Sequence, residues 1–459
     1  MNKKLLWILP IILILYFLVC IVFFYSDYKY ALNVKKQGAE YLRQNSNEIL
    51  DRVAQVDKKI VIIKPILVFN KDWREKAEFV HKVAESKEII KEIGGLSGEK
   101  TFLVLMQNNA EMRPSGGFWG AYGVLKIRNA RIVSFQTGDT YLFDLKSQGK
   151  FDPPAETREY FANEWRLWNA NWSPDFATAA KQALFFYQQI DSQTKIDGVI
   201  GPNVDYLLSL LKSTGPIEVP GYSFNIDENN FVQKMIYEPI DPAVIETRKN
   251  DPNFITSNKV VKNMLGNLAT TILDKIEADG QEITFARSTN TALINKDLLL
   301  YFNQDELQKA SVSLNWDGKI SGGNSLVVID ANIGSKLDFL ISKKSVTKKI
   351  GAGLYETTLI YKNNFVPSKE SDLFSTYRNL VRIFVPKDST LVSWSGGQKD
   401  VSTSYDQDTN KTVFTNLTIL TPDESDTLKF TWQTSEEYLH TPLEIEKQSG
   451  NKINNYYVD

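Results

Sequence analysis

The chain has 459 residues, with 53 Lys and Arg against 55 Asp and Glu, which leaves a formal net charge of −2 at pH 7. Basic and acidic side chains are interspersed along the sequence, so we expect no nucleic-acid partner. With one Cys and two His in the whole chain, a disulfide framework, a thiol nucleophile, a histidine zinc site and a Ser-His-Asp triad are all disfavoured.

An uninterrupted apolar run fills residues 5–25, with Lys3 and Lys4 before it and Asp27 after it. A helix rises about 1.5 Å per residue, so this run can span a bilayer core of roughly 30 Å. No small-residue cleavage site follows it, and the lysines favour a cytoplasmic N-terminus. We therefore expect an uncleaved transmembrane helix within residues 1–27, a location in a bacterial cell membrane and an extracytoplasmic main body. Cys20 falls in this run, and an outer body without disulfides suits a bacterial envelope protein.

Residues 28–96 are predicted to form a helical stalk, which includes an amphipathic helix over 72–93 that ends at Gly94-Gly95. Residues 97–311 then alternate strands with helices, a pattern that predicts an α/β layer domain. Asn129 marks a hairpin turn between the second and third strands. Strands are expected at residues 101–106, 118–127, 131–135, 196–200 and 298–302, and helices at 173–190, 204–212, 228–237, 259–277 and 304–309.

Short β-rich runs, separated by turn residues such as Gly396-Gly397, replace the helical periodicity from residue 312. This spacing predicts an antiparallel β-sandwich of immunoglobulin-like size over residues 312–443. Residues 444–459 are expected to form a loosely held tail. The runs cover residues 326–329, 355–361, 380–385, 390–394, 412–420 and 428–434.

The segment best suited to chemistry is residues 107–118, which follows the first strand of the α/β domain. It contains Glu111, Arg113, Ser115 and the pair Gly116-Gly117. Glycine amides can form an anion-binding nest, and a fixed guanidinium beside them suits a phosphate or carboxylate. We expect these five residues to bind an anionic ligand, with the Arg113 guanidinium open to solvent. The alternative is a tight loop with an internal Glu111–Arg113 pair.

Several separated motifs resemble one bacterial family, catalogued as domain of unknown function 4012. They occupy residues 107–118, 169–176, 197–200, 214–216 and 330–334. The resemblance extends from about residue 102 through the β-rich end. The family name implies no activity.

That family is distantly similar to the LytR-CpsA-Psr proteins, single-pass envelope enzymes that transfer glycopolymers from a polyprenyl-pyrophosphate lipid to the cell wall. The resemblance implies an α/β core in which Arg113 and Asp139 are catalytic and Asp139 holds Mg²⁺. It also implies a basic segment with Arg248 and Lys249 as ligand-binding residues. The sequence departs from the pattern at Gly138, where an arginine is expected, and lysines replace most arginines of the basic segment.

Other polar and aromatic residues have two interpretations. Asp175 begins a helix, where it is better explained as a cap than as a catalytic acid. Asn169, Asn171 and Trp172 could line a carbohydrate cleft, since an indole face stacks on sugar rings. Trp165 and the other tryptophans nearby are equally well explained by core packing.

Three functions follow from these observations. The first is a single-pass envelope protein that binds and transfers a lipid-linked (pyro)phosphate glycopolymer to peptidoglycan. The second is a non-catalytic cell-surface binding or structural protein with a degenerate enzyme-like domain. The third is a glycosidase that pairs Glu111 with Asp139 or Asp175. A deep apolar groove with a basic rim at Arg113 would favour the first function, and a shallow or filled surface there would favour the second.

Overall fold

The computed structural model describes residues 26–458 except 28, 35, 38–39, 42, 68–70, 148, 161–163, 220–223, 239–256 and 367–374, and describes only the backbone at 62–67, 257–264 and 283. The predicted membrane span at 5–25 lies outside these residues. Within the described part, no helix combines the length and apolar character that crossing a bilayer requires. The chain divides into two compact units, Met1–Lys100 with Lys126–Val133, and Thr101–Leu125 with Ser134–Asp459.

The first unit is helical in its described part. Its named helices are α2 (Ser46–Leu67), α3 (Lys71–Glu85) and α4 (Lys87–Ile93). The single helix predicted over 72–93 is interrupted at Ser86, whose hydroxyl donates to the Lys82 carbonyl at 2.7 Å. Such local side-chain bonds compete with the helical ladder.

This unit also contains a tight hairpin turn. Asn129 and Ala130 have φ angles of 49° and 55°, which is the left-handed region that a type I′ turn requires. Their amides donate to the carbonyls of Gly95 at 3.0 Å and Gly94 at 2.7 Å. The predicted turn at Asn129 is therefore confirmed.

The second unit opens with a mixed five-stranded sheet in the order β3-β2-β1-β4-β7. β1 and β4 run parallel, and β7 is antiparallel to β4. The carboxyl ends of β1 and β4 therefore lie next to each other at one edge, where open α/β sheets place their ligands. The strands are β1 (Lys100–Asn108), β2 (Phe118–Arg128), β3 (Arg131–Asp139), β4 (Gly198–Pro202) and β7 (Leu298–Phe302).

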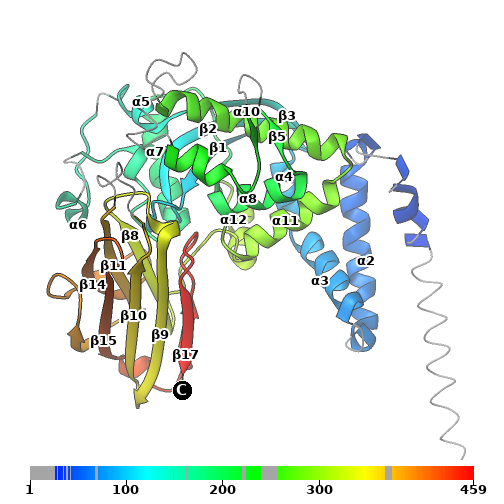
Figure 1. The fold of residues 1–459 in the computed structure, drawn as a ribbon. Coiled ribbons are helices and arrows are strands. Elements are labelled where there is room, and N and C mark those ends of the chain that lie inside the picture. Colours follow the sequence, from blue (N-terminus) through cyan, green and yellow to red (C-terminus); the bar gives the residue numbers. More distant parts are fainter. Residues whose placement is uncertain are drawn as a thin grey trace, which may run out of the picture. The chain divides into compact units, whose positions relative to one another are not determined.

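Helices accompany this sheet in the second unit (Figure 1). Apolar residues of β1 and α7 share one buried cluster with Trp119 and Val199, and α8 and α10 share another. The helices are α5 (Thr140–Asp144), α6 (Ala155–Arg158), η1 (Leu167–Asn169), α7 (Phe176–Gln188), α8 (Val204–Thr214), η2 (Gln233–Tyr237), α10 (Ser257–Ala278), α11 (Glu282–Ile294) and α12 (Asp305–Ser313), with a small ribbon of β5 (Ile217–Glu218) and β6 (Asn225–Ile226).

Two mostly antiparallel sheets follow, in the orders β13-β14-β11-β8-β16 and β12-β15-β10-β9-β17 (Figure 1). Alternating apolar residues of both sheets form a common core that includes Leu359, Phe430 and Trp432, as expected for a sandwich. The strands are β8 (Ser325–Asn332), β9 (Ile341–Gly351), β10 (Leu354–Asn363), β11 (Tyr377–Pro386), β12 (Thr390–Ser395), β13 (Ser402–Asp406), β14 (Lys411–Leu420), β15 (Ser425–Gln433), β16 (Glu444–Glu446) and β17 (Asn454–Val458), with short helices η5 (Asp338–Leu340) and η7 (Glu436–Tyr438).

The expectation of a loosely held tail at residues 444–459 is wrong for its described part. β16 pairs in parallel with β8, and β17 pairs in parallel with β9. Between these strands, Gln448 and Asn451 are almost completely buried. The segment is polar in sequence, but its side-chain amides form hydrogen bonds with other buried polar groups. Burying these polar residues therefore has little net free-energy cost.

Candidate functional site

Arg113 is buried in the structure, with 5% of the residue exposed. Its Nη2 donates to Glu111 Oε1 at 2.9 Å, and its guanidinium carbon lies 5.3 Å from the centre of the Phe118 ring. The expectation that this guanidinium is open to solvent is therefore wrong. The internal Glu111–Arg113 pair, our alternative interpretation, is present, because a buried guanidinium needs a nearby carboxylate.

The glycine pair serves close packing. Gly116 and Gly117 have φ angles of 134° and 146°, which side chains rarely adopt. A Cβ atom would lie 2.6 Å from Ser449 Oγ at Gly116 and 2.7 Å from the Asn108 carbonyl carbon at Gly117. Ser115 beside them is fully buried. The space in which an anion would meet these glycines is thus occupied by protein atoms.

Residues 447–453, named here the C-terminal segment, cover the candidate loop. Gln448 Nε2 donates to the carbonyl of Arg113 at 3.2 Å and to that of Pro114 at 3.3 Å. Asn109 Nδ2 donates to the Gly450 carbonyl at 3.0 Å. The C-terminal segment therefore lies against the loop that follows β1.

The helix N-terminus beside the loop is also capped by protein groups. Asn109 Oδ1 accepts from the amide of Val204 at 3.2 Å, and Asn203 Oδ1 accepts from the amide of Tyr206 at 3.0 Å. Helix N-termini attract anions through such amides, but here amide side chains already accept their hydrogen bonds. Protein side chains therefore already occupy this edge of β1 and β4.

The predicted acidic residues act as helix caps. Asp139 accepts from the Leu142 amide at 3.1 Å and begins α5. Asp175 accepts from the Thr178 amide at 2.8 Å and begins α7, which confirms its interpretation as a cap. Each contact places a carboxylate at a helix N-terminus, where the macrodipole favours negative charge.

A magnesium ion does not fit this arrangement. Mg²⁺ prefers carboxylate oxygens in near-octahedral geometry, whereas Asp139 caps a helix and Glu111 pairs with Arg113. Among the described residues, no three His, Cys, Asp or Glu side chains gather as metal ligands would.

Two further predictions concern the family pattern. At Gly138, a Cβ atom would lie 2.8 Å from the Tyr122 ring, so the packing of Tyr122 explains why glycine stands where an arginine was expected. Arg248 and Lys249 lie outside the described residues, and their predicted role in ligand binding remains a prediction.

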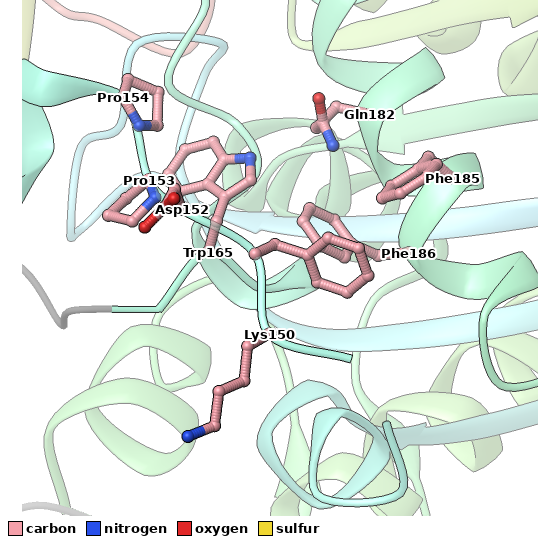
Figure 2. A pocket seen from close by; sticks show the side chains of 9 residues that line it. Lys150, Asp152, Pro153, Pro154, Trp165, Gln182, Phe185 and Phe186 are labelled. Atoms are coloured by element: carbon pink, nitrogen blue, oxygen red, sulfur yellow. The ribbon is translucent and has the colours of Figure 1, made fainter. Parts of the chain in front are cut away.

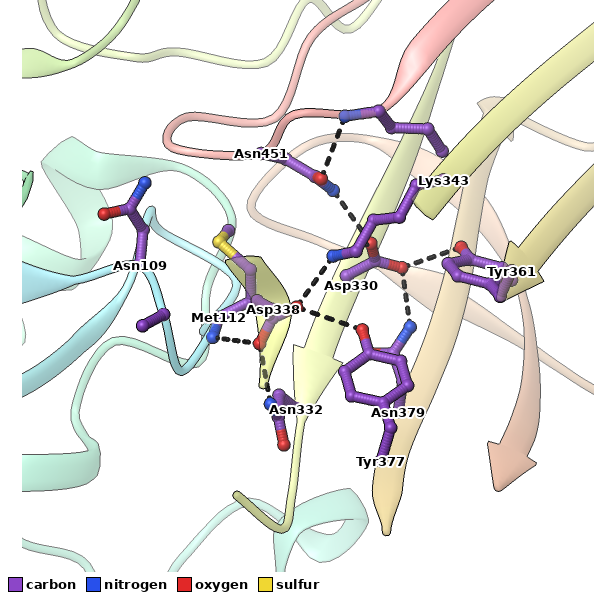
Figure 3. A network of polar contacts seen from close by, with 12 residues as sticks. Asn109, Met112, Asp330, Asn332, Asp338, Lys343, Tyr361, Tyr377, Asn379 and Asn451 are labelled. Carbon is purple, nitrogen blue, oxygen red and sulfur yellow. Dashed lines mark hydrogen bonds and ion pairs between the residues drawn. The ribbon is translucent and has the colours of Figure 1, made fainter. Parts of the chain in front are cut away.

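A buried ionic network, which sequence reasoning missed, lies beneath the loop (Figure 3). Lys343 Nζ contacts Asp330 Oδ2 at 2.9 Å and Asp338 Oδ1 at 2.7 Å. Burial alone would lower the pKa of Lys343, but the two carboxylates outweigh it and raise this pKa. Asp338 Oδ2 also accepts from the Met112 amide at 2.9 Å, so the network holds the candidate loop against the sandwich.

Each carboxylate of the network is saturated by further donors. Donors to Asp330 are Tyr361, Asn379 and Asn451, and donors to Asp338 are Asn332 and Tyr377. Asp330 belongs to a motif noted in the sequence, but Lys343 and Asp338 do not. The sequence signal for this network was Lys343, a lysine at an inward position of a strand with alternating burial. A buried network with all partners present points to a structural role.

Trp119, Trp165 and Trp172 belong to one buried cluster. Trp119 is fully buried and Trp172 is 6% exposed. Arg382 lies over the Trp172 ring at 4.4 Å and donates to its carbonyl at 3.0 Å. These two tryptophans pack in the interior. Trp165 belongs to the same buried cluster and is 7% exposed, and it also lines an open depression.

This aromatic depression has a volume of about 520 Å³ (Figure 2). Its lining combines aromatic rings with two prolines, a lysine, a carboxylate and an amide, from the loop that precedes α6, from Trp165 between α6 and η1, and from α7. None of Glu111, Arg113 or Asp139 lines it. Its principal members are Phe151, Asp152, Trp165, Gln182, Phe185 and Phe186.

Residues 97–239 match a family model described as "Protein of unknown function (DUF4012)", which confirms the resemblance over this part of the chain. No curated protein matches the chain. Among solved structures, it is similar to protein gbs0355 from Streptococcus agalactiae, with 13% identity and a TM-score of 0.28 over 50% of this chain and 76% of that one. It is also similar to Lin1025 from Listeria innocua, with 13% identity and a TM-score of 0.26 over 48% of this chain and 78% of that one. At these TM-scores, neither likeness bears on function.

Proposed function

We propose that the chain is a non-catalytic protein of the bacterial cell surface, in which a degenerate enzyme-like α/β domain is joined to a β-sandwich. Residues 5–25 would anchor it in the membrane, with the main body extracytoplasmic. One observation carries the proposal. The Arg113 guanidinium is buried against Glu111 and Phe118, so this cation is not presented to a pyrophosphate.

The surroundings of Arg113 support the same proposal. Phosphoryl transfer works by positioning and charge neutralisation, which needs accessible cations and, in most enzymes, a metal site. Here the diglycine packs on Ser449 and Asn108, and Asp139 is used as a cap. The depression lined by Phe151, Trp165 and Phe185 lies elsewhere, and Arg113 is not among its lining residues.

The competing proposal is that the α/β domain binds, and transfers to peptidoglycan, a lipid-linked (pyro)phosphate glycopolymer. In that case the C-terminal segment would have to leave the loop after β1 before an anion could enter. Gln448 alone makes three hydrogen bonds to buried carbonyls of Arg113, Pro114 and Asp330. Each lost hydrogen bond costs about 1 kcal/mol, which opposes this opening.

A thermal-shift titration of the full chain in lipid nanodiscs tests the proposal, with farnesyl pyrophosphate as the probe, with and without Mg²⁺. We expect no saturable change in the unfolding midpoint. A true ligand present at a hundredfold excess over its Kd would stabilise the fold by about 2.7 kcal/mol, a shift of several degrees.

Arg113→Lys serves as the diagnostic variant, because it keeps the charge but loses the bidentate geometry. A saturable stabilisation of the wild-type chain that this variant weakens would refute the proposal. Lys212→Met, on the exposed side of α8, is the control for loss of a surface charge.

A further inference from the structure

Two edge-to-face ring pairs line the aromatic depression. Phe151 meets Phe185 at 5.2 Å with an interplanar angle of 83°, and Phe186 at 5.3 Å with an angle of 82°. Phe186 is 1% exposed and Trp165 7%, so these rings form the floor. Phe185 remains 41% exposed, although it belongs to a helix whose other aromatic residues are buried. Phe185 therefore contributes exposed apolar surface at the depression.

Backbone and side-chain contacts hold the loop opposite α7 in place. The Trp165 amide donates to the Phe151 carbonyl at 2.7 Å. Arg166 Nη1 donates to the Gly149 carbonyl at 2.8 Å, and its Nη2 pairs with Glu164 at 2.6 Å. The walls are therefore set before any ligand arrives, which reduces the entropy lost on binding.

Two polar groups accompany the rings. Gln182 lies one turn before Phe185 and Phe186 on α7, and the side chain of Asp152 is 89% exposed. Figure 2 shows Gln182 on the α7 side of the depression and Asp152 with Pro153 and Pro154 on the other, while the Lys150 amine points away from the rings. The ligand would thus meet apolar faces, one carboxylate acceptor and one amide that both donates and accepts.

We propose that this depression binds a neutral saccharide. A sugar ring has an apolar C–H face that packs on an aromatic ring and a rim of hydroxyls that need both acceptors and donors. The volume of about 520 Å³ lies within the range of small-molecule sites. The Asp152 carboxylate pairs with Arg158 at 3.4 Å, so the polar side of the depression carries balanced charge and suits a neutral ligand. A purely apolar ligand would leave the carboxylate and the Gln182 amide without hydrogen-bonding partners in the ligand.

This inference rests on the proposed function, because it assigns a ligand class to a surface protein that acts by binding. The saccharide site and the proposed function are tested by different measurements. Sugar binding is measured at Phe185 and Gln182, whereas the proposed function is tested with a pyrophosphate at Arg113.

The experiment is a saturation-transfer NMR titration of the full chain in nanodiscs with N,N′-diacetylchitobiose, a neutral disaccharide. We expect a Kd of about 1–10 mM, typical of a weak single-site contact. Phe185→Ala should weaken binding at least tenfold, and Gln182→Ala about threefold to tenfold, because each removes one class of contact. Trp394→Ala, which removes a 45% exposed aromatic on β12, should leave the Kd unchanged.

Several outcomes would overturn the inference. The first is absence of binding by the wild-type chain, and the second is a Kd that neither Phe185→Ala nor Gln182→Ala changes. Equal or tighter binding of cyclohexanol, an apolar ring of similar size, or of tetraproline would assign the depression to another ligand class. Circular dichroism melting of each variant separates loss of the site from loss of the fold, and Gln182→Ala keeps the test valid if Phe185→Ala unfolds.

Discussion

Lys343 is the residue on which the buried polar contacts of the second unit converge. Its side chain is 3% exposed, and those of Asp330 and Asp338 are 0% and 3% exposed. The ammonium offsets the cost of burying the carboxylates. Amide and phenol donors supply the remaining hydrogen bonds to the carboxylate oxygens. Removing one partner of such a pair is costly, because the remaining charge cannot return to water.

Lys343→Met is therefore expected to lower the free energy of unfolding by about 3–5 kcal/mol. Urea denaturation followed by tryptophan fluorescence measures this loss. Lys348→Met is the matched control, since Lys348 lies on the same strand with an exposed side chain, and it should change stability by less than about 0.5 kcal/mol. Equal effects of the two substitutions would contradict a supporting role for Lys343.

Arg113 shows that a local sequence predicts the chemical groups of a loop but does not determine their exposure. The sequence predicted either an internal Glu111–Arg113 pair or an open guanidinium, and the structure contains the pair. The choice depends on Gln448 and Ser449, more than 300 positions later, which cover the loop. No spacing within residues 107–118 encodes this contact, so the chemistry of the loop could be described but its exposure could not.

At the scale of elements, most strands and helices follow from periodicity, and β9 shows physically why one strand did not. The strand β7 at Leu298–Phe302 was predicted at its observed bounds because it is a continuous apolar run. β9 was missed, although it alternates, because its inward residues include Lys343, Ser345 and Thr347 rather than apolar side chains. A strand whose buried face is polar cannot be distinguished from a solvated loop by hydrophobic periodicity.

The short helix α5 and the turn η1 are joined by Asp144, which is expected to respond to pH. Its carboxylate accepts from the amides of Leu167 at 3.2 Å and Trp168 at 3.1 Å. Burial nevertheless raises the pKa of Asp144 from 3.8 to about 6. The folded state therefore holds this proton more tightly than the unfolded chain, and the free energy of unfolding should fall as pH rises from about 4 to about 6.

Asp144→Asn is expected to remove this slope. The shift corresponds to about 3 kcal/mol at 1.36 kcal/mol per pH unit, which the high effective dielectric of real proteins reduces to about 1–2 kcal/mol. Urea unfolding at pH 4, 5, 6 and 7 measures it. Asp423→Asn, at a side chain that is 87% exposed, should leave the slope unchanged. A wild-type slope that persists in Asp144→Asn would assign the titration to other groups.

At the scale of the second unit, the C-terminal segment connects parts of the chain that are distant in sequence. Asn451 donates to Asp330 at 2.9 Å in the sandwich, while Ser449 donates to the Lys296 carbonyl at 2.6 Å next to β7. Gln448 reaches the loop after β1. A contact set of this kind makes separate unfolding of the α/β part and the sandwich unfavourable, because opening one exposes buried polar groups of the other.

Truncation after Leu443 should therefore destabilise both parts of the second unit together. The deletion removes β16, the C-terminal segment and β17, and leaves carbonyls of Arg113 and Pro114 and the carboxylate of Asp330 short of donors. At about 1 kcal/mol for each lost hydrogen bond, and with the pairing of β16 and β17 also lost, we expect a loss of roughly 4 kcal/mol or more in urea unfolding. Hydrogen exchange should also quicken in residues 107–118.

Truncation after Ile453 is the matched control, because it removes only the edge strand β17, whose Tyr456 is 50% exposed. It should cost about 1–2 kcal/mol and leave exchange in residues 107–118 unchanged, since the hydrogen bonds of Gln448 and Asn451 remain. If both truncations had the same effect, the stabilisation would come from strand pairing at the sandwich edge. The filled edge of the α/β sheet would then be a consequence of the fold rather than one of its supports.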